Sequence, residues 1–182
     1  MRKIEKNINP INLKAIQQKA QHSIDQGAVT EDYSLDLNTA YTLLNSALAT
    51  EIMCTLRYRH HQIIAKGIDK PQVAAEFKEH ADDEQRHMMM IAERINQLGG
   101  DPDFNPETVK KRTATEYGAG NNIYHLVEEN LVAERIAIMI YRELIEWFGN
   151  ADPTTRRLLE EILKDEEDHA DDLSDLLHSQ KK

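Results

Sequence analysis

Two short stretches, DEQRH at residues 83–87 and DEEDH at residues 165–169, each place a glutamate and a histidine three residues apart within an apolar helical pattern. The first lies between Phe77 and Ile91, and the second is followed by Leu173. Apolar residues at spacings of three and four are typical of a helix face that packs into a core. Any fold of this chain must therefore neutralise charged side chains at positions where a helix normally buries hydrocarbon.

The apolar pattern as a whole predicts four long helices, at about residues 36–66, 71–99, 122–148 and 153–179. Short turns join the first helix to the second and the third to the fourth. The connection at residues 99–120 holds four Gly and two Pro, so it cannot continue a helix, and it is too long for a tight turn. Two antiparallel hairpins joined by a long crossover predict an all-α, ferritin-like four-helix bundle rather than a coiled coil or a simple up-down-up-down bundle.

Residues 1–35 are predicted to form an N-terminal arm with a short helix from about Pro10 to Asp25, and residues 36–182 to form the bundle. The arm is rich in basic residues and has two interpretations, a solvated extension or a tail that touches DNA. The net charge of -10 weighs against general affinity for nucleic acid and favours a surface that gathers cations. The basic residues lie in the first twenty positions of the arm, which hold Arg2, Lys3, Lys6, Lys14 and Lys19 against the single acid Glu5.

The chain is expected to be soluble and cytoplasmic. Its first residues contain no apolar core of a secretory signal, and no run reaches the roughly 18 apolar residues of a membrane span. Cys54 is the single cysteine, which excludes a disulfide framework and a Cys-x-x-Cys site. We interpret Cys54 as a small packing residue in a reducing compartment.

Each predicted helix carries a glutamate near the middle of its apolar stripe. Burying an unpaired carboxylate costs several kcal/mol, and the stripes offer no Lys or Arg to pair with. A pair of metal ions would neutralise the four carboxylates together, whereas a structural polar network is the alternative. An antiparallel bundle brings the four glutamates and two histidines to one level. The predicted metal-binding and catalytic residues are Glu51, Glu84, His87, Glu134, Glu166 and His169.

The spacing of these residues indicates an approximate internal duplication. Glu51 precedes Glu84 by 33 residues, and Glu134 precedes Glu166 by 32. A single Glu-x-x-His on a helix would carry little weight, because such pairs are common on solvated faces. The similar Asp175-x-x-His178 is accordingly interpreted as surface charge.

The predicted ligands are oxygen and imidazole donors without thiolate, which favours iron or manganese over structural zinc or iron–sulfur clusters. Ligating histidines usually donate their other N–H group to a carboxylate. We therefore assign Asp83 to His169 and Asp165 to His87, with solvent-facing aspartates as the alternative. Two tyrosines, each seven residues after a helix glutamate, are predicted to reach ligand carboxylates with their hydroxyl groups. They are Tyr58 and Tyr141.

On these residues the chain resembles bacterioferritin and its relatives in the ferritin-like superfamily. The resemblance covers residues 37–178 and is most specific in EILKDEEDH at residues 161–169. It implies a ferroxidase that binds two Fe(II) per chain, oxidises them with O2 or H2O2 and stores Fe(III) as mineral inside a protein shell. Manganese in place of iron stays open.

Three features depart from bacterioferritin. Gln85 replaces the haem-ligating Met, so haem is not expected. The 13 residues after His169 leave no room for the fifth helix of 24-subunit shells, and the N-terminal arm is longer. The last two features resemble the 12-subunit Dps-like cages, so a homo-oligomer of 12 subunits with an intra-subunit site is favoured over 24, without DNA binding.

Other functions on the same bundle are a rubrerythrin-like peroxidase, a manganese catalase and a DNA-coating, Dps-like protein. Rubrerythrins usually carry a Cys-x-x-Cys module and an additional glutamate near the third helix ligand. The chain has one cysteine, and Ala137 lies three residues after Glu134. Evolution of O2 from H2O2 with bound manganese would distinguish the catalase.

Overall fold

The computed structural model describes residues 11–22, 24–67 and 70–179. Across these ranges all regular structure is helical, and there is no strand. The elements are α1 (Leu13–Lys19), the 3-10 helix η1 (Ile24–Gln26), α2 (Leu37–Ile64), α3 (Lys70–Gln97), α4 (Pro106–Arg112), α5 (Ile123–Phe148) and α6 (Pro153–Ser179).

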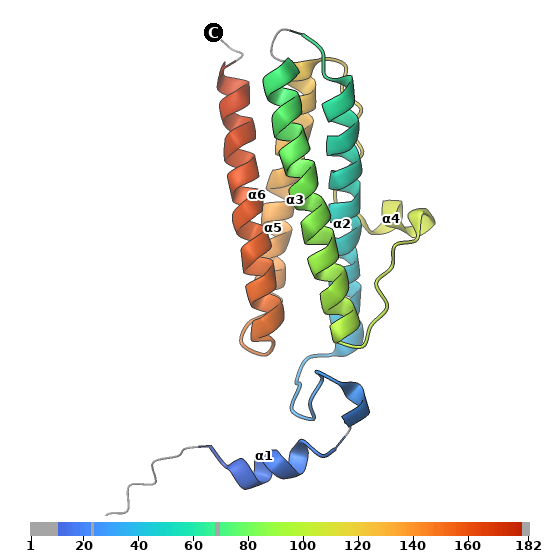
Figure 1. Ribbon diagram of the computed structural model, residues 1–182, viewed down its shortest axis with the longest axis vertical. Helices are drawn as coiled ribbons and strands as arrows, with labels where there is room; N and C mark the ends of the chain where they lie inside the picture. The colour runs from blue at the N-terminus through green and yellow to red at the C-terminus, as the bar shows by residue number, and fades with distance from the viewer. Residues whose placement is uncertain (1–10, 23, 68–69, 180–182) are drawn as a thin grey trace, which may run out of the picture.

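Four long helices lie side by side and form the bundle (Figure 1). Helix α2 packs mainly against α3, and α5 packs mainly against α6, so the bundle consists of two hairpins. The crossover from α3 to α5 runs along the outside of α2 and carries α4 (Figure 1). The all-α four-helix bundle with a long connection between its second and third long helices is confirmed.

Polar side chains cap the bundle helices at the predicted ends. Asp36 accepts a hydrogen bond from the backbone N–H of Thr39 at 2.8 Å, and Asn122 accepts one from His125 at 3.0 Å. Such caps satisfy N–H groups that have no partner within the helix. Helix α3 ends before Gly99, whose φ of 88° lies in the left-handed region that glycine adopts without a steric penalty.

The crossover and the N-terminal arm differ from the sequence interpretation. The crossover contains α4, which the sequence analysis did not predict; Asn105 caps its start and Pro106 occupies its first turn. Val109 of α4 packs with Ala49 of α2. In the arm, the predicted helix from Pro10 to Asp25 is too long, because α1 ends at Lys19 and only η1 follows, while Pro10 lies outside the described residues.

A polar layer separates two apolar clusters along the bundle. On one side of it lie, among others, Leu44, Leu48, Ile91, Ile95, Leu144, Phe148, Leu159 and Ile162. On the other side lie Val73, Phe77, Leu126, Val127 and Leu173. None of the helices in the described part of the chain has the length and apolar character needed to cross a bilayer.

A buried ion pair joins the end of α3 to the turn between α5 and α6. Arg94 Nη2 lies 2.9 and 3.0 Å from the two carboxylate oxygens of Asp152, and Arg94 Nε donates to Thr155 Oγ1 at 2.7 Å. Asp152 also accepts a hydrogen bond from the backbone N–H of Thr155 at 2.9 Å. This contact ties the two hairpins together at one end of the bundle.

Candidate metal centre

The structure brings the six predicted ligand side chains together in the polar layer. Each is at most 4% exposed, although all six are ionisable. Helices α2 and α5 contribute one glutamate each, and α3 and α6 contribute one Glu-x-x-His pair each. We call these six side chains the central cluster: Glu51, Glu84, His87, Glu134, Glu166 and His169.

The central cluster divides into two overlapping sets of potential ligands. In one set, ligand atoms of Glu51, Glu84, His87 and Glu166 all lie within 4.8 Å of one another. In the other set, the same is true of Glu84, Glu134, Glu166 and His169. Glu84 and Glu166 belong to both sets, which is the position of carboxylates that bridge two cations.

The distances within the central cluster are those of groups that face a common centre. His87 Nδ1 lies 3.2 Å from Glu166 Oε1 and 3.6 Å from Glu84 Oε2. His169 Nδ1 lies 3.9 Å from Glu84 Oε1. Ligands that sit about 2.1 Å from a metal ion are separated from one another by about 3–4 Å.

Most of these polar atoms have no hydrogen bond. Both carboxylate oxygens of Glu84 and of Glu166, Oε2 of Glu51 and of Glu134, and Nδ1 of both histidines are buried without a partner among the described residues. Unsatisfied buried polar groups are rare in folded proteins because each costs about 1–3 kcal/mol. The donor set therefore fits two divalent cations, which would satisfy these atoms together.

In the metal-free protein, protons bound to the side chains of the central cluster neutralise part of its negative charge. Burial and the neighbouring carboxylates raise the pKa of Glu84 and of Glu166 well above the usual value for glutamate. Burial alone would lower the pKa of His87, but the nearby carboxyl groups of Glu51 and Glu84, each 3.6 Å from Nδ1, raise this pKa to about 10. Burial opposes ionisation of Glu51 too, yet the nearby His87 and the hydrogen bond from Tyr141 lower its pKa. The metal-free cluster is thus a partly protonated set of carboxyl groups around an imidazolium.

The outward-facing nitrogens of both histidines lie near aspartates of the opposite helix. Asp165 Oδ2 is 3.2 Å from His87 Nε2, and Asp83 Oδ2 is 3.4 Å from His169 Nε2, the two pairings that the sequence analysis assigned. A carboxylate in this position fixes the ring orientation and leaves the other nitrogen free for a metal. Arg86 lies between the two aspartates and donates to Asp83 at 3.0 Å and to Asp165 at 2.7 Å.

Both predicted tyrosines reach carboxylates of the central cluster. The Tyr58 hydroxyl donates to Glu134 Oε1, and the Tyr141 hydroxyl donates to Glu51 Oε1. Burial and the nearby glutamates raise the pKa of both phenols well above their usual value, so the hydroxyl groups stay protonated.

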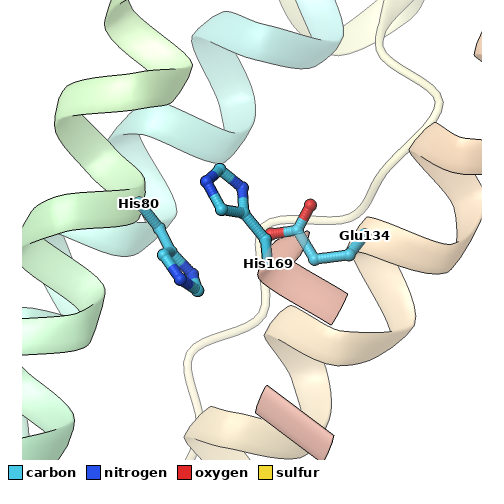
Figure 2. Close-up of side chains that lie close together, drawn as sticks. All are labelled: His80, Glu134 and His169. Carbon is cyan, nitrogen blue, oxygen red and sulfur yellow. The ribbon is translucent and has the colours of Figure 1, made fainter. Parts of the chain in front are cut away.

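Two further residues lie at this site and were not predicted from the sequence, His80 and Arg86. His80 is buried on α3, and its ring stacks on that of His169 with the centroids 4.0 Å apart. Figure 2 shows His80 on α3 together with His169 on α6 and Glu134 on α5. Burial and His169 lower the pKa of His80 to about 3. Its place one helical turn before Glu84 on the same face was a signal in the sequence, whereas nothing marked Arg86.

Proteins with known names are similar to this chain over about 70% of its length. A bacterioferritin from Desulfovibrio desulfuricans is 30% identical over 128 residues, which are 70% of this chain and 68% of the relative. A nutrient stress-induced DNA-binding protein from Synechococcus sp. is 31% identical over 132 residues, which are 70% of this chain and 74% of the relative. The resemblance to bacterioferritin and to Dps-like proteins is confirmed.

Solved structures with the same fold include a dodecameric thioferritin, the bacterioferritin-related protein of Bacteroides fragilis. It is 31% identical, with a TM-score of 0.78 over 81% of this chain and 89% of that one. Dps from Thermosynechococcus elongatus is 20% identical and shares the fold, with a TM-score of 0.74 over 77% of this chain and 90% of that one. The model of the ferritin-like domain matches residues 41–182. Because this match spans all four helices of the bundle, the chain belongs to the ferritin-like family.

Proposed function

We propose that this protein is a ferroxidase and an iron-storage protein. The central cluster takes two Fe(II) ions per chain as substrate, and O2 or H2O2 oxidises them. The Fe(III) product is stored inside a homo-oligomeric shell. The observation that supports this most is that Glu84 and Glu166 belong to both ligand sets, so two ions would share them.

The chain's own residues have separate tasks in this reaction. Glu84 and Glu166 hold the two ions close together, so that both electrons reach one oxidant molecule without release of a radical. Two electrons and two protons convert O2 to H2O2, or H2O2 to two waters. The protons that Fe(II) displaces from the bridging glutamates are available for this step. Tyr58 orients Glu134 and Tyr141 orients Glu51, each by a hydrogen bond from its hydroxyl group.

An acidic pocket of about 270 Å³ adjoins the central cluster between α3 and α6. Its negative potential would raise the local concentration of Fe(II). We propose that Glu79 and Asp83 bind ions transiently as these move between the central cluster and the surrounding solution. The pocket is lined by Glu76, Glu79, His80, Asp83, Arg86, Asp165, Asp168, His169 and Asp172.

We propose that 12 copies of the chain form the shell, because the bacterioferritin-related relative from Bacteroides fragilis is dodecameric. The native mass, measured together with the bound iron, tests this assembly. A closed shell with many irons per chain supports storage. A dimer with two metals per chain would instead indicate a redox enzyme without storage, such as a manganese catalase or a peroxidase.

An anaerobic titration with Fe(II), followed by addition of the oxidant, tests the ferroxidase activity. The rise in absorbance of Fe(III) should saturate at two irons per chain, and Glu84→Ala should abolish this fast phase. Glu93→Ala is a matched control, because Glu93 lies on the same helix but is exposed. Saturation at another stoichiometry, or full activity of Glu84→Ala, would refute the proposal.

A DNA-protecting role is the second candidate, since two relatives, from Synechococcus and Nostoc, are named DNA-binding proteins. The net charge of -10 opposes it, and most of the basic residues of the arm lie outside the described residues. A gel-shift assay at low salt distinguishes the two roles. Retarded DNA whose binding is lost on removal of residues 1–20 would support the DNA-protecting role.

A further inference from the structure

His80 is a buried histidine with one nitrogen that makes no hydrogen bond. Its side chain is 2% exposed, and within the described part of the chain Nε2 has no hydrogen-bond partner. The proposed ferroxidase reaction assigns no task to this residue. A buried imidazole nitrogen without a partner therefore requires an explanation of its own.

The hydrogen bonds around His80 define which of its nitrogens carries the proton. The Tyr58 hydroxyl donates its hydrogen to Glu134, so the Tyr58 oxygen is an acceptor towards other groups. His80 Nδ1 lies 3.2 Å from this oxygen and acts as the donor. In a neutral imidazole with the proton on Nδ1, Nε2 presents a lone pair.

The lone pair of His80 Nε2 faces two carboxylates. Glu76 Oε1 lies 3.3 Å away, and Asp172 Oδ2 lies 3.9 Å away. Three acceptor atoms that converge without a proton between them repel one another. A cation at their centre would turn this repulsion into three attractive contacts, and the three ligand atoms do lie within 4.8 Å of one another.

We propose that Glu76, His80 and Asp172 bind one divalent cation in the wall of the acidic pocket. We call these three residues the outer site. One imidazole and two carboxylates suit Fe(II), Co(II), Zn(II) or Mn(II). The side chains of Glu76 and Asp172 are 27% and 57% exposed, so water completes the coordination and ions can exchange with the solution.

The outer site lies next to the central cluster and is connected to it through His80. The His80 ring stacks on His169, and Tyr58 bridges His80 Nδ1 and Glu134 (Figure 2 shows the three residues His80, Glu134 and His169). A cation in the outer site would lie on the pocket side of the His80 ring, and that ring would separate it from the ligands of the central cluster. A role in loading Fe(II) rests on the proposed ferroxidase function, whereas binding of the cation does not.

His80 is also within ligand distance of Glu134 and His169, so it could instead contribute to the central cluster. Glu76 and Asp172 distinguish an ion in the outer site from a contribution of His80 to the central cluster, because both contact His80 and neither belongs to the central cluster. Removing these two carboxylates must lower the number of bound ions if the outer site exists. The same change leaves every ligand of the central cluster in place.

The test is an anaerobic titration of the metal-free, full-length protein with Co(II), read by equilibrium dialysis and by the visible absorption of bound Co(II). We expect the double variant Glu76→Gln/Asp172→Asn to bind one Co(II) per chain fewer than the unsubstituted protein. His80→Phe, which keeps the stacked ring, should show the same loss. The control Asp171→Asn/Asp175→Asn changes the charge by the same amount at exposed positions of α6 outside the pocket lining, and it should bind as many ions as the unsubstituted protein.

An unchanged Co(II) count in Glu76→Gln/Asp172→Asn would overturn the outer site, even if His80→Phe failed to fold. Equal losses in this variant and in the charge-matched control would overturn it as well, because they would indicate general attraction by negative charge. Failure of the ferroxidase proposal is visible separately in Glu84→Ala. This variant should lose ions of the central cluster and keep the one that depends on Glu76 and Asp172.

Discussion

The hydroxyl group of Tyr141 on α5 donates a hydrogen bond to Oε1 of Glu51 on α2. Both side chains are 1% exposed, and the contact crosses from one helical hairpin to the other. Tyr58 on α2 makes the reciprocal contact with Glu134 on α5. Each half of the internal duplication therefore supplies the tyrosine that donates a hydrogen bond to a cluster glutamate of the other half, Glu51 or Glu134.

We expect Tyr141→Phe and Tyr58→Phe each to weaken binding of one of the two metal ions. The substitution keeps the ring in the core but removes a hydrogen bond to a charged group, worth about 1.5–3 kcal/mol. This corresponds to a loss of affinity of about tenfold to a hundredfold at one site. Stepwise titration with Co(II) measures it; two unaltered binding steps in both variants would show that the hydroxyl groups do not support the ligands.

Asp165→Asn should lower the affinity of the central cluster for metal by about 10- to 100-fold. The Asp165 carboxylate lies 3.2 Å from His87 Nε2, and an amide at this place no longer favours the charge distribution of a ligating imidazole. Asp168→Asn is the control, because Asp168 lines the same pocket but pairs with Lys164. Equal affinities of the two variants would contradict the orienting role of Asp165.

Binding of metal should release protons at neutral pH. In the metal-free protein, the raised pKa values of Glu84 and Glu166 and the pKa of about 10 of His87 keep protons on groups that must lose them to bind a cation. Affinity should therefore fall as the pH is lowered. Calorimetric titration with Zn(II) in two buffers of different ionisation enthalpy measures the number of protons released. A heat of binding that does not depend on the buffer would contradict this prediction.

Glu84→Gln should stabilise the metal-free protein while it abolishes binding at the central cluster. A carboxyl group whose pKa is raised on folding stabilises the folded state at low pH. This contribution is lost as the pH rises above 4.5, the ordinary pKa of glutamate, towards the raised pKa of the folded protein. Glutamine keeps the size of the side chain and cannot ionise. We expect a gain of roughly 1–4 kcal/mol at pH 8.

Urea unfolding of the metal-free proteins at pH 5 and pH 8 measures this gain. The difference between Glu84→Gln and the unsubstituted protein should shrink at pH 5, because Glu84 is then protonated in more of the unfolded chains. Glu93→Gln on the exposed face of α3 should show no such difference. A loss of stability in Glu84→Gln at pH 8 would mean that the carboxylate has a partner other than a metal ion.

The positions of the long helices and of the central cluster follow from local rules, which explains why the sequence predicts them. Helix periodicity places Glu84 and His87 on one face, and an antiparallel bundle brings that face to the level of Glu166 and His169. The pairings of Asp83 with His169 and of Asp165 with His87 follow from the same geometry, since each aspartate precedes a cluster glutamate on the facing helix. Whether the central cluster binds metal remains a prediction.

Contacts that depend on the rotation and axial offset of the helices were not predictable from the same rules. His80 lies on the same face of α3 as Phe77 and Glu84, but its neighbour Asp172 is 92 residues away and sits on a face that periodicity assigns to solvent. Helix α4 had local signals, with a cap at Asn105 and Pro106 in the first turn. They were missed because Gly and Pro mark the connection as irregular, while packing of Val109 against α2 stabilises a seven-residue helix there.

Arg94→Ala should destabilise the bundle without changing the number of metal ions bound. Arg94 is 8% exposed and Asp152 is 3% exposed, so removal of the guanidinium leaves a buried carboxylate without its cation. This situation costs about 3–5 kcal/mol. Arg94→Lys should recover part of the loss, because lysine restores the charge but not the second N–H donor that reaches Thr155.

Arg142→Ala is the control for the loss of an ion pair at the surface. Arg142 pairs with Glu167, and their side chains are 61% and 46% exposed, so the change should cost less than about 1 kcal/mol. Urea unfolding measures both variants, and Co(II) titration should give the same count in each, because Arg94 lies at the end of the bundle away from the central cluster. Similar stabilities of Arg94→Ala and Arg142→Ala would mean that the buried ion pair adds little to the contact between the hairpins. The turn between α5 and α6 would then be held by packing of the apolar cluster beside it.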